Sequence, residues 1–501
     1  MKQFMDEARK LIRINSVATG GNEEIANYAN GILQDRGFKC DLQPVMHSLE
    51  NISKRQFNVI GVLGDPLVDR KTKKGLLLLS HLDTAVPGAS ADWTESQQNP
   101  FELSVANGQF TGLGVASGKL DFLCRVHAAQ RFRERKLKMP IYIVGTCGGT
   151  LGMFGAKYLI QARTLNPLLG LVSEPTGLQL ATAQKSCTEM RLSIGFQKIE
   201  RDARGFNRKL RMISRGRPAS SADPSQGEHA ILHALALLEE ARASGFELRF
   251  TALDGGVWPK LVPDLCQIDL FTTSHQFEDF KAFFHHYAEN AGRKDSFELE
   301  AAGMNESGVN FLPEALFPCL IEVFSGMSDA QLRSQSEQSS SLIPGMSPPG
   351  ISFHFSMIKQ RLGGIDLFFD FRADPWQDAS QIEAELQKAV RQVSASYSGL
   401  NMTLTRERSV NALFPKEFAQ GPQGLIETVQ RAARSSDFDL ETVPIASASE
   451  AALFQKAGYE VAAFGPGSPF SCVGSPNENV SAEELERAMV FYDRLIQEVC
   501  L

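Results

Sequence analysis

Apolar residues in the first third of the chain recur at helical spacing or form short unbroken runs. A spacing of three to four residues predicts helices, and short apolar runs bounded by Gly or Pro predict buried strands. The predicted elements are helices over 4–14, 22–37, 119–136 and 154–163, and strands over 57–64, 75–83, 139–148 and 168–177. Because strands alternate with helices, we expect a doubly wound, mostly parallel sheet.

The pattern changes near residue 186. Apolar and polar residues now alternate, as in "CTEMRLSIGF" (187–196), which predicts antiparallel strands. Further predicted elements are helices over 226–244 and 377–395 and strands over 264–274 and 363–375. The stretch 325–350 is rich in Ser, Gln, Gly and Pro and predicts a loop.

After about residue 409 the first pattern returns, with predicted helices over 421–435 and 481–499. We therefore predict an α/β fold in which one domain is interrupted by another. Residues 1–185 and 409–501 form the doubly wound domain, and residues 186–408 form an inserted α+β domain.

Composition excludes several classes of function. The 501 residues carry a formal net charge of −7, which does not favour binding to nucleic acid or to an anionic membrane surface. No stretch approaches the roughly 20 apolar residues of a transmembrane helix. The eight cysteines are dispersed without a CxxC motif, so we expect a reduced, cytoplasmic protein.

Polar side chains stand where two predicted central strands end. His81 and Asp83 follow the leucine run of "GLLLLSHLDTAVPG", and Glu174 ends another strand in "VSEPTG". The carboxyl ends of parallel strands share one edge of a sheet, where ligand sites form. Imidazole and carboxylate groups are typical ligands of zinc, so this edge is a candidate metal site.

Several motifs, taken in order, resemble one enzyme family nearly end to end. They are "SHLDTAVPG", "GLGVASGKLD", "VSEPTG" and "FGPGSPFSCVGSPNENV". They are similar to motifs of the dizinc metallopeptidase family that includes aminoacylases, acetylornithine deacetylase, succinyl-diaminopimelate desuccinylase, carboxypeptidases and dipeptidases. The resemblance implies a zinc-exopeptidase-like fold with an inserted lid and dimerisation domain. It also implies amide hydrolysis by a water molecule activated between two zinc ions.

The family's residues are only partly retained. By resemblance, His81 and Glu174 would ligate one zinc, and Asp83 would orient the His81 imidazole. The other expected groups are a bridging Asp, a general-base Glu, a ligand Glu, a second ligand His and a lid His, and their positions hold Ser117, Gly149, Thr150, Gly474 and Ser220. A centre without its bridge and its base should not hydrolyse amides.

We therefore interpret the chain as a pseudoenzyme that binds a small amino-acid-like or peptide-like ligand, or a protein partner. The alternative is a weakly active or altered metal-dependent peptidase or deacylase acting on N-acyl amino acids or dipeptides. A third hypothesis is a structural subunit that dimerises through its lid domain. We expect either no metal or a single zinc ion rather than a pair.

Other residues leave more than one interpretation open. His81 and Asp83 form a remnant hydrogen-bonded pair, or His81 and Glu174 hold one residual metal. Cys147 and Cys472 precede the emptied positions 149 and 474 by two residues. They are either substitute zinc ligands or small buried apolar residues.

Two further side chains are candidates for substrate binding. Arg372, in "DFRADP", resembles the lid arginine that reaches the substrate carboxylate, but it could equally form a surface ion pair. Glu450, in "ASASEAALF", occupies the place of an acidic residue that shapes the pocket.

Overall fold

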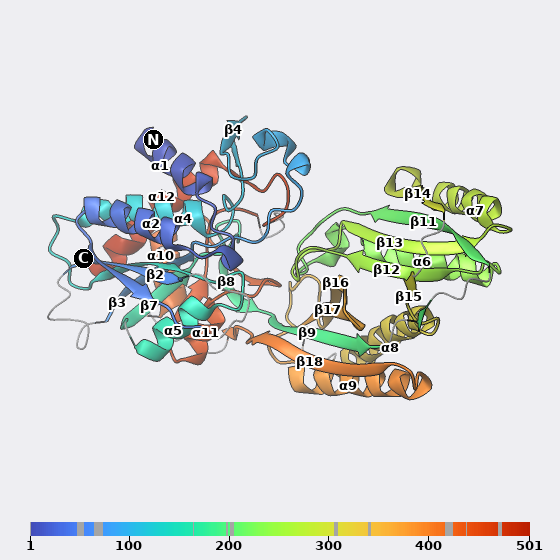
Figure 1. Ribbon diagram of the computed structural model, residues 1–501. Helices are drawn as coiled ribbons and strands as arrows, with labels where there is room; N and C mark the ends of the chain where they lie inside the picture. Colours follow the sequence, from blue (N-terminus) through green and yellow to red (C-terminus); the bar gives the residue numbers. More distant parts are fainter. Residues whose placement is uncertain are drawn as a thin grey trace. The chain divides into compact units, whose positions relative to one another are not determined.

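The computed structural model describes residues 2–47, 55–64, 74–163, 165–196, 199–200, 205–304, 309–338, 342–415, 424–436, 438–468 and 473–501. The chain divides into two compact units, which Figure 1 shows. Unit 1 comprises Met1–Ser186, Ile343–Ser347 and Val410–Leu501, and unit 2 comprises Cys187–Leu342 and Pro348–Ser409.

The described part of unit 1 is built on an eight-stranded sheet in the order β1-β2-β6-β3-β7-β20-β8-β19. Its strands are β1 (Lys39–Pro44), β2 (Phe57–Leu63), β3 (Gly75–His81), β6 (Ile141–Thr146), β7 (Pro167–Val172), β8 (Leu180–Gln184), β19 (Thr442–Ile445) and β20 (Val461–Ala463). Strand β3 runs parallel to both of its neighbours, β6 and β7. Its four leucines are fully buried, as expected of a strand covered on both faces.

Helices cover both faces of this sheet. They are α1 (Lys2–Arg13), α2 (Glu23–Asp35), α4 (Gly118–Ala129), α5 (Phe154–Ala162), α10 (Leu425–Arg434), α11 (Ala451–Lys456) and α12 (Ala482–Cys500). Figure 1 shows α2, α4 and α12 on one side and α5 and α11 on the other. A small sheet of β4 (Ser104–Ala106), β5 (Gln109–Thr111) and β21 (Asn479–Ser481) completes the described part of the unit.

A fully buried arginine ties the strand ends together. Arg125, on α4, donates hydrogen bonds to the carbonyl oxygens of Leu79 on β3 at 2.7 Å and Leu171 on β7 at 2.8 Å. It also donates to the carbonyl of Phe464, just after β20, at 3.1 Å. Asp121, one helical turn earlier, pairs with the guanidinium at 2.7 Å. The buried charge is therefore compensated by an ion pair and by backbone acceptors.

The described part of unit 2 is built on an antiparallel sheet in the order β14-β11-β13-β12-β16-β17-β9-β18. Its strands are β9 (Ser186–Gly195), β11 (Phe206–Arg215), β12 (Arg249–Gly255), β13 (Leu265–Thr273), β14 (Phe297–Met304), β16 (Ser352–Arg361), β17 (Gly364–Ala373) and β18 (Asn401–Val410). A short pair, β10 (Ile199–Glu200) and β15 (Asn310–Phe311), forms a separate two-stranded sheet. The helices are α6 (Ala230–Ala243), α7 (Phe277–Asn290), α8 (Leu316–Glu337) and α9 (Ala379–Ser396).

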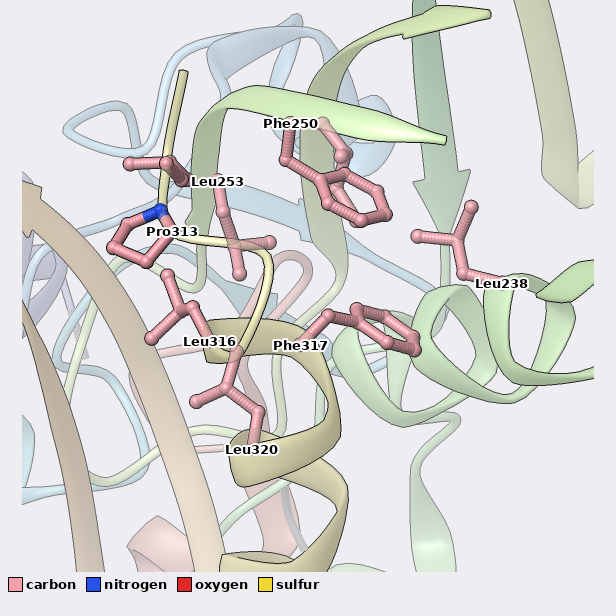
Figure 2. Close-up of a pocket in the computed structure, with 9 residues that line it drawn as sticks. Leu238, Phe250, Leu253, Pro313, Leu316, Phe317 and Leu320 are labelled. Atoms are coloured by element: carbon pink, nitrogen blue, oxygen red, sulfur yellow. The ribbon is translucent and has the colours of Figure 1, made fainter. Parts of the chain in front are cut away.

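Unit 2 has a hydrophobic core of its own, part of which Figure 2 shows. The ring of Phe250, on β12, stacks on that of Phe317, on α8, with centroids 5.3 Å apart and planes inclined by 14°. Leu238, on α6, lies beside them. The cavity between these side chains measures only about 10 Å³, so this core is closely packed.

The predicted α/β fold with a mostly parallel sheet and a separate antiparallel domain is confirmed. The prediction of a loop over 325–350 is wrong for residues 325–337, which belong to α8. Val323, Met327 and Ala330 are buried at helical spacing, and this spacing outweighs the polar composition between them. No described helix is long and apolar enough to cross a membrane.

Candidate functional site

The polar residues predicted at the strand ends meet at one edge of the unit 1 sheet. His81 ends β3 and lies opposite Thr146, the last residue of β6. Glu174 follows β7, whose Val172 pairs with Leu79 of β3. Residues in register on neighbouring strands point to the same face. The topology therefore gathers the candidate residues where parallel sheets carry their sites.

The Asp83 carboxylate is held by the loop that follows β6. Its Oδ1 accepts a hydrogen bond from the Gly149 N–H at 2.8 Å. Its Oδ2 accepts from the Thr150 N–H at 2.9 Å and from the Thr150 hydroxyl at 2.6 Å. The His81 Nδ1 lies 3.0 Å from the Asp83 carbonyl oxygen and 3.7 Å from Oδ1. The carboxylate thus binds the loop more closely than it binds the imidazole.

The His81 side chain occupies the space in front of Gly149. A Cβ atom on residue 149 would lie 2.5 Å from the His81 Cβ and 2.6 Å from its Cγ. Cβ atoms in proteins do not approach other atoms so closely, and both neighbours belong to a part-buried side chain. In this arrangement position 149 therefore has no room for the side chain of a general base.

Positions 117 and 474, where the resemblance predicts a missing ligand, have contacts of their own. Ser117 immediately precedes α4, and its carbonyl accepts a hydrogen bond from the Ser173 hydroxyl at 3.5 Å. Gly474 has a φ of +77°, and a Cβ there would lie 2.9 Å from the Cβ of Ala85. A histidine at position 474 would be strained in this left-handed conformation. The Gly474 N–H instead donates to Glu478 at 2.9 Å.

Glu450 is the most perturbed acid near this edge. Its side chain is buried, and its Oε2 accepts a hydrogen bond from the Thr146 hydroxyl at 2.8 Å. Its Oε1 has no hydrogen-bond partner in the described structure. Burial, with the negative charges of Asp83 and Glu174, raises the pKa of Glu450 to about 8, although the Thr146 bond lowers it. Glu450 therefore holds a proton at neutral pH more often than an ordinary glutamate does.

Cys147 is buried, and its thiol lies 3.6 Å from the Asn58 side-chain oxygen. Burial raises the pKa of this thiol well above its usual value, which disfavours the thiolate that zinc prefers. Cys472, its proposed partner, lies outside the described residues. Among the described residues, no group of three or more His, Cys, Asp or Glu side chains could hold a metal ion.

Arg372 belongs to unit 2 and is not a surface residue. Its guanidinium Nε donates to Asp370 at 3.1 Å, and a terminal nitrogen donates to the Ser221 hydroxyl at 2.8 Å. Both charged side chains are at most 4% exposed. The interpretation as a surface ion pair is therefore wrong in one respect, because the ion pair is buried. Apolar residues alternate with Asp370 and Arg372 along this strand and form the core on its other face, so the alternation does not predict that Arg372 is buried.

Two buried charged residues near the site were not predicted. Glu478 accepts from the N–H groups of Ala116 and Gly474, each at 2.9 Å. The Lys119 ammonium donates to the carbonyl of Leu11 at 3.1 Å, and burial lowers the pKa of Lys119 to about 7. The sequence offered one signal for this, a lysine among apolar residues directly after "VASG". Charged residues are almost never fully buried unless they are paired, so such a lysine indicates a buried charge with partners.

Comparisons with known sequences point to one family. The sequence model of peptidase family M20/M25/M40 matches residues 77–498. Acetylornithine deacetylase from Pectobacterium carotovorum (strain PC1) is 30% identical over 234 residues, covering 46% of this chain and 52% of that protein. Acetylornithine deacetylase from Photorhabdus laumondii is 27% identical over 254 residues, covering 50% and 56%. The chain thus spans about half the length of these relatives.

Solved structures share the fold over nearly the whole chain. Human carnosine dipeptidase 1 aligns with a TM-score of 0.60 and 13% identity, covering 99% of this chain and 96% of that one. Aminoacylhistidine dipeptidase from Vibrio alginolyticus aligns with a TM-score of 0.54 and 15% identity, with the same coverage of 99% and 96%. Identities this low concern the fold alone.

Proposed function

Because the chain belongs to peptidase family M20/M25/M40, we propose that it is a metallopeptidase-like and deacylase-like protein that has lost two-metal hydrolysis. Its retained role is to bind a small amino-acid-like or peptide-like ligand, or a protein partner. The observation that carries this proposal is the overlap between His81 and any side chain on residue 149. Loss of a general base typically lowers the rate of hydrolysis by about 10²–10⁴-fold.

Members of this family typically bind zinc, and the described residues do not fit a pair of zinc ions. Both Asp83 oxygens are hydrogen-bonded to the loop at 149–150. Ser117 and Gly474 carry no carboxylate or imidazole, so the bridge and one ligand are missing. His81 and Glu174 remain as donors for at most one weakly held ion, because a stable zinc site needs about three protein ligands.

A second candidate is a weakly active, metal-dependent hydrolase with one zinc ion. It is supported by the relatives, since the curated ones are named acetylornithine deacetylases and the solved structures include dipeptidases. The retention of His81 and Glu174 also supports it. In this case the substrate would be an N-acyl amino acid or a dipeptide, and the zinc would supply the activated water.

Unit 2 corresponds to the dimerisation-type lid domain of the family. We propose that two copies of the chain, or this chain and an active relative, associate through it. Arg372 and Glu450 remain the proposed ligand contacts. Arg372 would have to exchange part of its bonding to Asp370 and Ser221 for a ligand carboxylate.

One experiment separates the two candidates. The protein is purified without a metal-affinity step, its zinc content is measured, and hydrolysis is assayed with added zinc or cobalt. The substrates are N-acetylornithine, other N-acetyl amino acids and dipeptides that include carnosine. We expect substoichiometric zinc and no turnover. Metal-dependent turnover that His81→Ala abolishes, and that the exposed control His275→Ala retains, would overturn the loss of activity and support the second candidate.

A further inference from the structure

Unit 1 contains an apolar cavity of about 240 Å³ that shares no lining residue with the site at the end of β3. Its walls come from α1, β5 and the beginning of α12. Phe4, Phe110 and Leu485 form its buried part, each at most 4% exposed. Met5 and Met489 are half-buried and line it as well. Methionine side chains adapt easily to ligands of different shape.

A single charged residue lines this cavity within the described part of the chain. Glu486 lies on the exposed side of α12, one residue after Leu485 of the cavity wall. Its carboxylate makes no hydrogen bond or ion pair with another described residue. The cavity therefore combines an apolar interior with a negative charge that is free to pair with a ligand.

We propose that this cavity binds a small organic cation that carries one ring or a short alkyl chain beside an ammonium group. The size of the cavity supports this class, because an engineered apolar cavity of about 150 Å³ already binds benzene. The charge supports it too, since Glu486 attracts an ammonium group and repels a carboxylate. The site goes beyond the proposed function and does not depend on it.

Three probes of nearly equal shape test the proposal on the full chain. They are phenethylamine, 2-phenylethanol and 3-phenylpropionate, and each is titrated by ligand-observed NMR. We expect the amine to bind most tightly and the carboxylate most weakly. Glu486→Gln should weaken binding of the amine by about two- to fivefold, the range for an exposed charge pair, and should leave the alcohol unchanged. Glu483→Gln, on the same helix but outside the cavity, is the matched control.

A blocking variant tests the cavity itself. Ala482 lines the cavity, so the ring of Ala482→Phe should fill it and abolish binding of the amine and the alcohol. Circular dichroism checks that Ala482→Phe folds. If Ala482→Phe does not fold, the test rests on Glu486→Gln, which changes only an exposed side chain. The proposal is overturned if no probe binds, if the carboxylate binds as well as the amine, or if Glu483→Gln weakens the amine as much as Glu486→Gln does.

Discussion

The side chain of His81 lies where a side chain on Gly149 would begin, 2.5 Å from the position of its Cβ. The two residues are also linked through Asp83, which accepts the Gly149 N–H and lies next to the His81 ring. The packing at the end of this strand therefore requires a residue without a side chain at position 149. A side chain introduced there would change more than one contact.

We predict that Gly149→Ala destabilises the fold by about 1–3 kcal/mol, the usual cost of overpacking. Gly149→Glu should destabilise it at least as much and should not restore hydrolysis. Urea unfolding measures both free energies. The control is Gly31→Ala on α2, where a Cβ meets no atom within 4 Å. Alanine should raise the free energy of unfolding there by about 0.5–1 kcal/mol. If Gly149→Ala unfolds like the parent chain, the overlap with His81 is not a real constraint.

Thr150→Val should cost about 1–3 kcal/mol of unfolding free energy. The valine keeps the shape and the backbone N–H bond to Asp83 but removes the hydroxyl that donates to the buried carboxylate at 2.6 Å, and a hydrogen bond to a charged group contributes about 1.5–3 kcal/mol. Thr403→Val, at an exposed position of β18, should be nearly neutral. Equal effects of the two substitutions in thermal or urea unfolding would contradict a role for the loop in holding Asp83.

Two histidines in unit 2, the part-buried His229 and the buried His354, make its stability sensitive to acid. His229 caps α6 with its Nδ1, which accepts from the Leu232 N–H at 3.2 Å, and its Nε2 donates to the Phe355 carbonyl at 2.8 Å. This pair of bonds requires the neutral ring. Burial and the neighbouring His354 lower the pKa of His229 to about 3. Burial lowers the pKa of His354 to about 4.

We therefore expect the stability of unit 2 to fall as the pH drops below about 6.5, because the unfolded histidines then bind protons that the folded ones exclude. The unfolding free energy falls by about 1.4 kcal/mol per pH unit for each histidine. The fall ends near the pKa values that the histidines have in the folded protein. His229→Asn retains a capping side chain and should reduce the slope. Unfolding measured at intervals from pH 7 to pH 4 checks this, and an unchanged slope in the variant would contradict it.

Glu450 should have the opposite pH dependence. Its pKa is raised to about 8 in the folded chain, so the folded protein keeps a proton that the unfolded chain releases near its ordinary pKa. Stability from this group is complete at low pH and is lost as the pH rises toward 8. Glu450→Gln stays neutral at every pH. Its unfolding free energy should therefore rise relative to that of the parent by about 1.4 kcal/mol per pH unit between pH 5 and 8. A constant difference between the two proteins across that range would show that Glu450 titrates normally.

The order of elements in unit 1 could be predicted because its strands are buried on both faces. The run around Leu76–Leu79 has no polar interruption, and its end at His81 marks the edge where the site lies. In unit 2, the helix over 325–337 was missed because Ser and Gln fill its exposed face. Its buried positions are spaced as a helix requires, so the periodicity carried the information that the composition obscured.

The sequence could locate the site but not its packing. Residue types can be read directly, and neither Ser117 nor Gly474 carries a carboxylate or an imidazole. The position of the His81 ring against Gly149 depends on the path of a loop held by Asp83, and no local pattern encodes such a long-range contact. The buried pairing of Arg372 with Asp370 is a further tertiary contact of this kind.

The guanidinium of Arg125 has a consequence for how this protein can be handled. From α4, on one face of the sheet, it brings a permanent positive charge to the carbonyl groups of three neighbouring segments. In many metalloproteins the ion helps to hold the fold together, so that chelators unfold them. Here the cation at the strand ends is an arginine side chain, which a chelator cannot remove. Prolonged dialysis against EDTA should therefore leave the melting temperature unchanged.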